Sequence, residues 1–323
     1  MSIPKFYIHP QDSALKHFPP LLSQHIPLSN AIHNRLRAPQ NTPLRHCLFA
    51  TTFPPNTPNS TPSEPWTILF SDRSRLKESQ IWIFNSLINS PVPLSPQESD
   101  TLNLQVKEAV HFLKNSEVKD APGWPFDPLL RFGGVHSLIT EVLVTEFRDA
   151  ISYITRWNMY TIPTTTNPDP GSENSPLHSL EKKTNTLPPG FTLSLIPTSH
   201  LPLIISTSSI PRQAETLKQQ ANACILNTEG EPVAWVYLGL DGSLATLYVV
   251  PEYRSRGLAT IVARELLKRL EEGGFEDLGI RGSSGWVHAE AKDGNVESET
   301  VMRRLGGCVA AETAYLSLDS EKI

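Results

Sequence analysis

A short loop rich in arginine and glycine is the segment of this chain best suited to bind an anion. An apolar run ends at Val250, and an amphipathic helix begins near Leu258. The first turn of a helix leaves about four backbone N–H groups unpaired and carries a partial positive charge, so it can receive a phosphate. Arginines in the loop add formal charge, and Gly257 has no Cβ to block a pyrophosphate. The sequence therefore predicts an anion-binding loop made of Arg254, Ser255, Arg256, Gly257, Leu258, Ala259 and Thr260.

The segments around this loop have clear periodicities. Apolar runs at 223–226, 233–238 and 244–250 predict three strands, separated by turns at 227–231 and at Asp241-Gly242. An apolar stripe from Leu258 to Leu270 predicts one helix, which Gly273 ends. A strand at 285–289, a helix at 297–305 and a strand at 313–318 follow. The order is strands, anion loop, helix, strand, helix, strand.

The motif Arg-x-x-Gly-x-Ala in the loop is similar to the acyl-CoA pyrophosphate loop of the GNAT superfamily of N-acyltransferases, and the order of elements agrees. Glu231–Trp235, the Asp241-Gly242 turn and Pro251–Arg254 resemble the glycine N-acyltransferase-like branch. The resemblance is specific over 188–320 and loose over 1–160. It implies an α/β (α+β) GNAT fold, with a mixed, mostly antiparallel sheet and helices on both faces, preceded by a degenerate GNAT-like domain. It also implies acyl-CoA or acetyl-CoA as the co-substrate.

Length and composition suggest two domains. A chain of 323 residues suits two domains of ordinary size. The stretch 161–187 is rich in Pro, Ser and Thr and lacks hydrophobic periodicity, so we expect an exposed linker there. The expected division is 1–160, the GNAT-like N-terminal domain, 161–187, the linker, and 188–323, the N-acyltransferase domain. In the first domain the nearest counterpart of the anion loop is Arg131–Gly134, which we expect to be an ordinary turn.

Composition also argues against several classes of binding partner and site. The formal net charge of −5 argues against nucleic acid. The 3 cysteines have no C-x-x-C spacing, which argues for a reducing compartment and against a zinc or other metal site. No apolar run approaches the ~18 residues of a membrane span, and no targeting segment is seen, so the cytoplasm is the default location. The sequence gives no indication of oligomeric state.

The resemblance implies where the acyl group lies. The strand that ends at Val249 and Val250 is expected to separate from its neighbour, so that the pantetheine amides pair with its free backbone edge. A backbone N–H near Val249 would then polarise the thioester carbonyl. Asn295 is expected either to bind the pantetheine arm or to cap a helix. The superfamily's tyrosine, which protonates the leaving thiolate, is replaced by Met302.

The general base is the open question. In the glycine N-acyltransferase branch a Glu stands eleven residues before the loop arginine, and here that position is Ser243. A serine needs a partner to act as a base near neutral pH. Tyr248, His288 and Glu290 are the substitutes, acting directly or through water, and His288 has a suitable ordinary pKa.

These features predict an acyl-CoA-dependent N-acyltransferase that moves an acyl group, acetyl included, to the amine of a small molecule such as an amino acid. Two alternatives stay open. The changes at Ser243 and Met302 favour a catalytically silent acyl-CoA-binding module. A protein or peptide N-acetyltransferase would use the same loop with a different acceptor groove.

Overall fold

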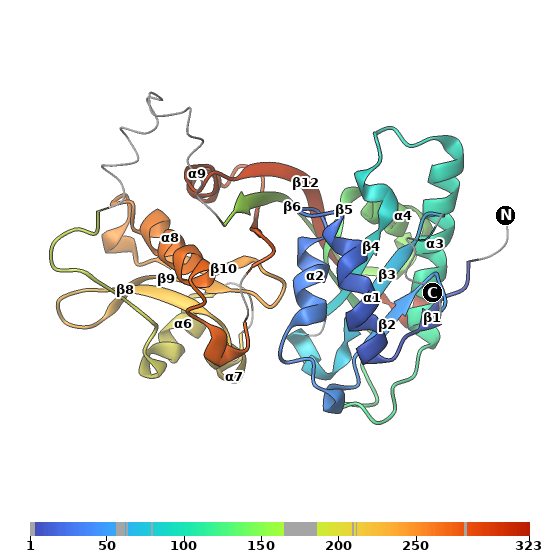
Figure 1. Ribbon diagram of the computed structural model, residues 1–323, viewed down its shortest axis with the longest axis horizontal. Helices are drawn as coiled ribbons and strands as arrows, with labels where there is room; N and C mark the ends of the chain where they lie inside the picture. Colours follow the sequence, from blue (N-terminus) through green and yellow to red (C-terminus); the bar gives the residue numbers. More distant parts are fainter. Residues whose placement is uncertain are drawn as a thin grey trace. The chain divides into compact units, whose positions relative to one another are not determined.

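The computed structural model describes residues 4–55, 62, 64–78, 80–164, 186–208, 210, 212–280 and 283–323 (Figure 1). Most of the predicted linker, 165–185, lies outside these residues, so its boundaries stay a prediction. The chain divides into two units, one made of Met1–Met159 with Val309–Ile323 and one made of Tyr160–Cys308.

The first unit is built on one mixed sheet with the strand order β1-β2-β3-β4-β5-β12-β6. The pairs β1–β2, β2–β3, β3–β4 and β5–β12 are antiparallel, whereas β4 and β5 run parallel. The strands are β1 (Tyr7–Ile8), β2 (Leu48–Thr51), β3 (Thr67–Asp72), β4 (Gln80–Asn85), β5 (Leu129–His136), β6 (Ile151–Pro163) and β12 (Cys308–Asp319). Its helices are α1 (Gln11–Ser23), α2 (Asn30–Arg37), α3 (Pro96–Asn115) and α4 (Ser137–Glu146).

Helices cover this sheet on both sides. Strands β2 and β3 are buried at every position, as nearly continuous apolar segments require. Helix α1 packs with α2 and α3 packs with α4, and both pairs contact the sheet (Figure 1). The core between these layers is rich in aromatic side chains, including Phe18, Phe49, Phe70 and Phe132.

The last strand lies in the first unit's sheet. The sequence predicted a strand at 313–318 and assigned it to the second domain; the strand is present, but β12 pairs with β5, from Thr313 opposite His136 to Asp319 opposite Leu129. Leu316 and Leu318 are buried in the first unit's core. Alternating apolar residues determine which face of a strand is buried, but they do not specify the neighbouring strand.

The segment Arg131–Gly134 is a second place where the structure differs from the sequence-based expectation, which was an ordinary turn. It lies inside β5 and is not a turn. A Cβ on Gly133 would lie 3.0 Å from Cδ of Gln80 on the neighbouring strand. Glycine therefore allows a side chain to approach the backbone closely here.

The second unit contains a four-stranded antiparallel sheet in the order β10-β9-β8-β7. Its strands are β7 (Thr192–Ser194), β8 (Asn222–Leu226), β9 (Pro232–Leu238) and β10 (Leu244–Val249). Strand β11 (Trp286–Ala291) follows β6 in the order of the other sheet. The helices are α6 (Leu201–Thr207), α7 (Ala214–Lys218), α8 (Leu258–Glu271) and α9 (Val296–Arg304).

Two cores flank the four-stranded sheet. Ala234 and Val236 of β9 pack with the buried stripe of α8, whereas Trp235 and Tyr237 pack with α6 and α7. This alternation is expected for a strand that is covered on both faces. The stripe predicted for α8 is confirmed, since Leu258, Ile261, Val262, Leu266 and Leu270 are all buried. The sheet therefore holds β10 and the N-terminus of α8 in fixed positions.

Candidate active site

The loop after β10 passes through two residues with left-handed backbone conformations. Pro251–Tyr253 form a 3₁₀ turn, Ser255 has a φ of 62° and Gly257 a φ of 76°. Turns of this kind gather successive backbone N–H groups around an anion. Within the described chain, no group accepts a hydrogen bond from the N–H of Ser255, Arg256, Gly257, Leu258 or Ala259. These donors remain for a ligand.

Gly257 keeps the N-terminus of α8 open. It is the N-cap residue and has no side chain that could accept from the first turn. A Cβ built on it would meet no atom within 4 Å. Its positive φ disfavours any other residue. The 14 residues of α8 add a partial positive charge at this open end.

The two loop arginines are exposed, and the loop itself holds them. Arg254 Nε donates to the carbonyl of Val249 at 3.1 Å, and the guanidinium lies 5.6 Å from the ring centroid of Tyr248. Arg256 Nη2 donates to the carbonyl of Glu252 at 3.3 Å. A guanidinium has five N–H donors, so each arginine keeps further donors for a phosphate.

Strand β10 turns part of its backbone away from the sheet near its end. A β-bulge interrupts it, and Thr246 within the bulge has a φ of 53°. The N–H of Val250 donates to Val233 O at 2.9 Å. Antiparallel ladders alternate, so the N–H of Val249, which stands opposite Ala234, points away from β9. Of the two valines assigned to acyl-CoA binding, Val249 is the one with an outward donor.

Strands β10 and β11 separate beside this edge. They belong to different sheets, and a single parallel bridge, between Ser243 and His288, joins them in the described residues. The N–H of His288 donates to Gly242 O at 3.3 Å. Beyond this bridge the outer edge of β10 is not covered by β11, as expected for a strand that offers its backbone to a ligand.

Two family models match this chain. One, described as the acyl-CoA N-acyltransferase verG N-terminal domain, matches residues 3–169, and the other, the acetyltransferase (GNAT) family, matches residues 197–281. The chain belongs to the acyl-CoA N-acyltransferases of the GNAT superfamily. No significant match is found among curated proteins.

Several solved structures are similar to this acyltransferase at low sequence identity, and the first described here shares its fold. A Drosophila protein is 12% identical and has a TM-score of 0.62, with 97% of this chain and 98% of that chain covered. A tandem GNAT protein from the clavulanic acid biosynthesis pathway is 12% identical, with a TM-score of 0.48 and 98% of each chain covered. A GCN5-related N-acetyltransferase from Sphaerobacter thermophilus is 12% identical, with a TM-score of 0.47 and coverages of 99% and 97%.

A polar cluster of the acyltransferase lies at the bridge between β10 and β11. Ser243 Oγ donates to Asp241 Oδ1 at 2.6 Å, and the N–H of Ser243 reaches the same oxygen at 3.1 Å. The second oxygen, Asp241 Oδ2, is 3.8 Å from His288 Nε2. The structure thus brings together two predicted site residues, Ser243 and His288. It adds Asp241, which the sequence indicated only as a turn residue.

Tyr248 belongs to an aromatic stack at the end of β10. Its ring lies 4.9 Å from that of Trp235, at an interplanar angle of 24°, with Arg254 on the ring as described above. The stack connects the loop to the sheet. Glu290 lies on β11, two residues beyond His288, and is half-buried.

The remaining predicted residues lie on α8 and α9. Asn295 caps α9, because its Oδ1 accepts the N–H of Ser298 at 3.1 Å; its contact with a pantetheine arm stays a prediction. Met302 is buried in the core beneath α9. The hydroxyl of Thr260 is buried without a hydrogen-bond partner in the described chain.

The described residues contain neither a membrane-spanning helix nor a cluster of metal ligands. No helix among them is long and apolar enough to cross a membrane. Within the same ranges, no three His, Cys, Asp or Glu side chains are arranged to hold a metal ion.

Proposed function

We propose that the second unit transfers an acyl group from acyl-CoA to the amine of a small molecule, such as an amino acid. The observation that carries the proposal is the run of backbone N–H groups from Ser255 to Ala259 without acceptors in the described chain, in front of an open Gly257. These donors, Arg254 and Arg256 fit a pyrophosphate in charge and in hydrogen-bonding capacity. The buried hydroxyl of Thr260, which has no hydrogen-bond partner among the described residues, adds a donor at the same helix end.

The edge of β10 supports the rest of the assignment. A pantetheine arm that leaves the loop would run along the strand where β11 has separated. The outward N–H of Val249 is then available to the thioester carbonyl, where it would stabilise the negative charge that develops during amine attack. The acyl group would therefore lie between β10 and β11, on the side where these strands diverge.

A screen for acylated products, called the product screen below, tests this function. The protein is incubated with acetyl-CoA and benzoyl-CoA, each with a mixture of amino acids and other small amines, and products are identified by mass spectrometry. We expect acylated small amines and stoichiometric release of the CoA thiol. A parallel incubation with lysine-containing peptides tests the peptide alternative. Acylation of peptides alone would contradict the small-molecule acceptor.

One observation favours a second candidate, a silent acyl-CoA-binding module. Met302, at the position where the superfamily carries its tyrosine, is 4% exposed and packs in the core, so it gives the thiolate no proton donor. Binding of CoA without turnover of any amine would support this candidate.

A further inference from the structure

We infer that Asp241 is the general base of the acyltransferase and that the Ser243 hydroxyl connects it to the incoming amine. This inference rests on the proposed function, because an amine that is protonated near neutral pH must lose a proton before it attacks a thioester. The sequence left this role without a carboxylate at the expected position. The structure provides one within a single hydrogen bond of that position.

The carboxylate takes the place that a longer side chain at Ser243 would fill. Ser243 Oγ and Asp241 Oδ1 are 2.6 Å apart. Because the angle at a hydroxyl oxygen is near tetrahedral, the carboxylate oxygen lies roughly 3.5 Å from Cβ of Ser243, which is about the reach of a glutamate side chain from its own Cβ. Serine and aspartate together can supply the chemistry of one glutamate.

The hairpin is shaped to hold this pair. A Cβ added to Gly239 would lie 2.4 Å from Asp241 Oδ1 and also 2.4 Å from Ser243 Oγ, so only glycine leaves room for both. The N–H of Gly239 donates to Ser243 O at 2.7 Å and closes the turn. The pair is thus held by backbone hydrogen bonds and by close packing, which fixes the distance between hydroxyl and carboxylate.

Burial separates the roles of the three side chains. His288 is 2% exposed and Asp241 9%, whereas Ser243 is half-buried. His288 Nε2 faces Asp241 Oδ2 from β11 at 3.8 Å, and the 239–243 turn contains no other titratable side chain. Of the three, Ser243 offers the most accessible polar group, so the amine meets the serine first.

The proton transfer balances without any further reagent. The ammonium nitrogen gives a proton to Ser243 Oγ, while the hydroxyl proton of Ser243 passes to Asp241 Oδ1. The amine becomes neutral, the serine hydroxyl is regenerated, and the carboxylate is left protonated. The nitrogen then attacks the thioester carbon, and the C–S bond breaks as the carbonyl re-forms. The second proton lost by the nitrogen passes to the CoA thiolate, directly or through water, so that the products are the amide and the CoA thiol.

The test compares pH–rate profiles of wild type and Asp241→Asn with the best amine from the product screen. The amide can still accept from Ser243, so the turn is kept while the base is removed. We expect the rate to fall about 10²–10⁴-fold near pH 7. The deficit should shrink as the pH approaches the pKa of the amine, because the amine then arrives neutral. A uniform loss at every pH, or no loss, would overturn the role of Asp241.

Ser243→Ala, alone and combined with Asp241→Asn, tests the connection and covers the case in which Asp241→Asn does not fold. We expect Ser243→Ala to show the same shrinking deficit, and the double variant to lose no more than Asp241→Asn alone, since coupled residues are not additive. Losses that simply multiply would refute the connection. CoA-dependent thermal stabilisation is measured for every variant. A wild type that binds CoA but acylates no amine would refute both the proposed function and the base.

Discussion

Helices α3 and α8 each follow a strand hairpin in their own unit, but the N-terminus of α3 is closed and that of α8 is open. Ser95 Oγ accepts the N–H of Glu98 at 3.3 Å, and Glu98 Oε2 accepts the N–H of Ser95 at 2.9 Å, which forms a capping box. Pro96, at the first helical position, has no N–H at all. Helix α8 begins instead at Gly257, without a side-chain cap.

Among the described residues, this difference favours the N-terminus of α8 over that of α3 as a place that could receive a phosphate. In α3 the carboxylate of Glu98 already occupies the positive end of the helix, and it would repel a pyrophosphate. The capping box stabilises the helix and uses up its donors at the same time. In α8 the first N–H donors have no acceptor among the described residues, at some expense in helix stability, and an anion could bind to them.

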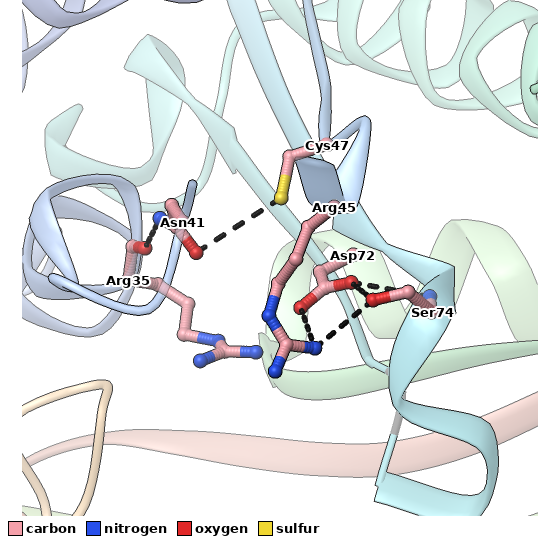
Figure 2. Close-up of polar contacts among 6 residues, drawn as sticks. All are labelled: Arg35, Asn41, Arg45, Cys47, Asp72 and Ser74. Carbon is pink, nitrogen blue, oxygen red and sulfur yellow. Dashed lines mark hydrogen bonds and ion pairs between the residues drawn. The ribbon is translucent and has the colours of Figure 1, made fainter. Parts of the chain in front are cut away.

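Two arginines of the first unit also differ from the two loop arginines of the second unit in their exposure and their partners. In the first unit Arg45 Nη1 donates to Ser74 Oγ at 3.1 Å and lies 3.8 Å from Asp72 Oδ2 (Figure 2). Arg35, from α2, is 4% exposed and lies over the ring of Phe70 at 5.8 Å. Arg45 is therefore half-buried against side chains of its own unit, and Arg35 is buried in it. Arg254 and Arg256 are exposed beside the N–H groups of 255–259, for which the described part of the chain offers no acceptor, so their charge is available to a ligand.

The largest effect should come from Gly257→Val. The branched side chain fills the open space at the helix N-terminus and disfavours the positive φ. We expect CoA affinity, measured by calorimetry, to fall about 100-fold or more, which corresponds to ~2.7 kcal/mol.

Gly230→Val is the matched control for this variant. Gly230 also has a positive φ, of 82°, and a Cβ there would also meet nothing within 4 Å. The substitution introduces the same backbone strain in the same unit without touching the loop. If both variants lost affinity equally, strain would be the cause and the loop would have no special role.

Replacing Arg254 or Arg256 with Ala should have the next largest effect. Each change removes a charge-assisted contact worth roughly 1.5–3 kcal/mol, so the affinity for CoA should fall at least tenfold. Binding should also become less sensitive to salt. Arg269→Ala is the control, because Arg269 lies within α8, away from the loop, and pairs with Glu265 at 2.6 Å. An unchanged Kd in both loop variants would count against the pyrophosphate assignment.

A carboxylate at the start of α8 should reproduce the closed state of α3. In Ala259→Glu the new charge sits in the first turn, where it favours the helix by ~0.3–1 kcal/mol but repels phosphate. We expect the melting temperature without ligand to hold or rise and CoA affinity to fall severalfold below that of Ala259→Gln. Equal affinities for the two variants would mean that charge at this end does not control binding.

How far the sequence predicts this site depends on how local each feature is. The loop, the hairpin before it and the stripe of α8 follow from neighbouring residues with periods of 2 and 3.6, and the structure places each near its predicted bounds. The role of Asp241 was missed because Asp-Gly is a turn signal. Its burial depends on His288, which is distant in sequence and becomes its neighbour only when β11 is in place.

Two other features also depended on distant partners. β12 pairs with β5, more than 170 positions away in the chain, and nothing in its own residues specifies that neighbour. In β5, Gly133 and Gly134 resemble turn residues, yet tertiary packing makes them part of a strand. Neither the pairing of β12 nor the strand conformation of these glycines can be predicted from the local sequence pattern.

Acid should destabilise the first unit, because a histidine that caps one of its helices becomes protonated. His136 Nδ1 accepts the N–H of Leu138 at 3.2 Å at the start of α4, and burial lowers the pKa of His136 to about 4. The unfolded pKa is about 6.5. Stability is therefore lost as the pH falls from that value toward 4, because protonation favours the unfolded chain. His136→Asn keeps an acceptor without a charge. We expect its melting temperature to fall less than wild type's between pH 7 and 5, and equal falls would exclude this cap as a cause.

The smallest effect should come from removing the side-chain cap at the N-terminus of α3. Ser95→Ala removes the N-cap of α3, which typically costs about 1 kcal/mol of stability. We expect a melting temperature lower by a few degrees and no gain of CoA binding in the first unit, because no arginine follows β4 in the way that Arg254 and Arg256 follow β10. CoA affinity of the whole chain should stay at the wild-type value, since the proposed site lies in the second unit. A change in CoA affinity with an unchanged melting temperature would show that α3 takes part in binding, and the contrast between the two helix ends would then fail.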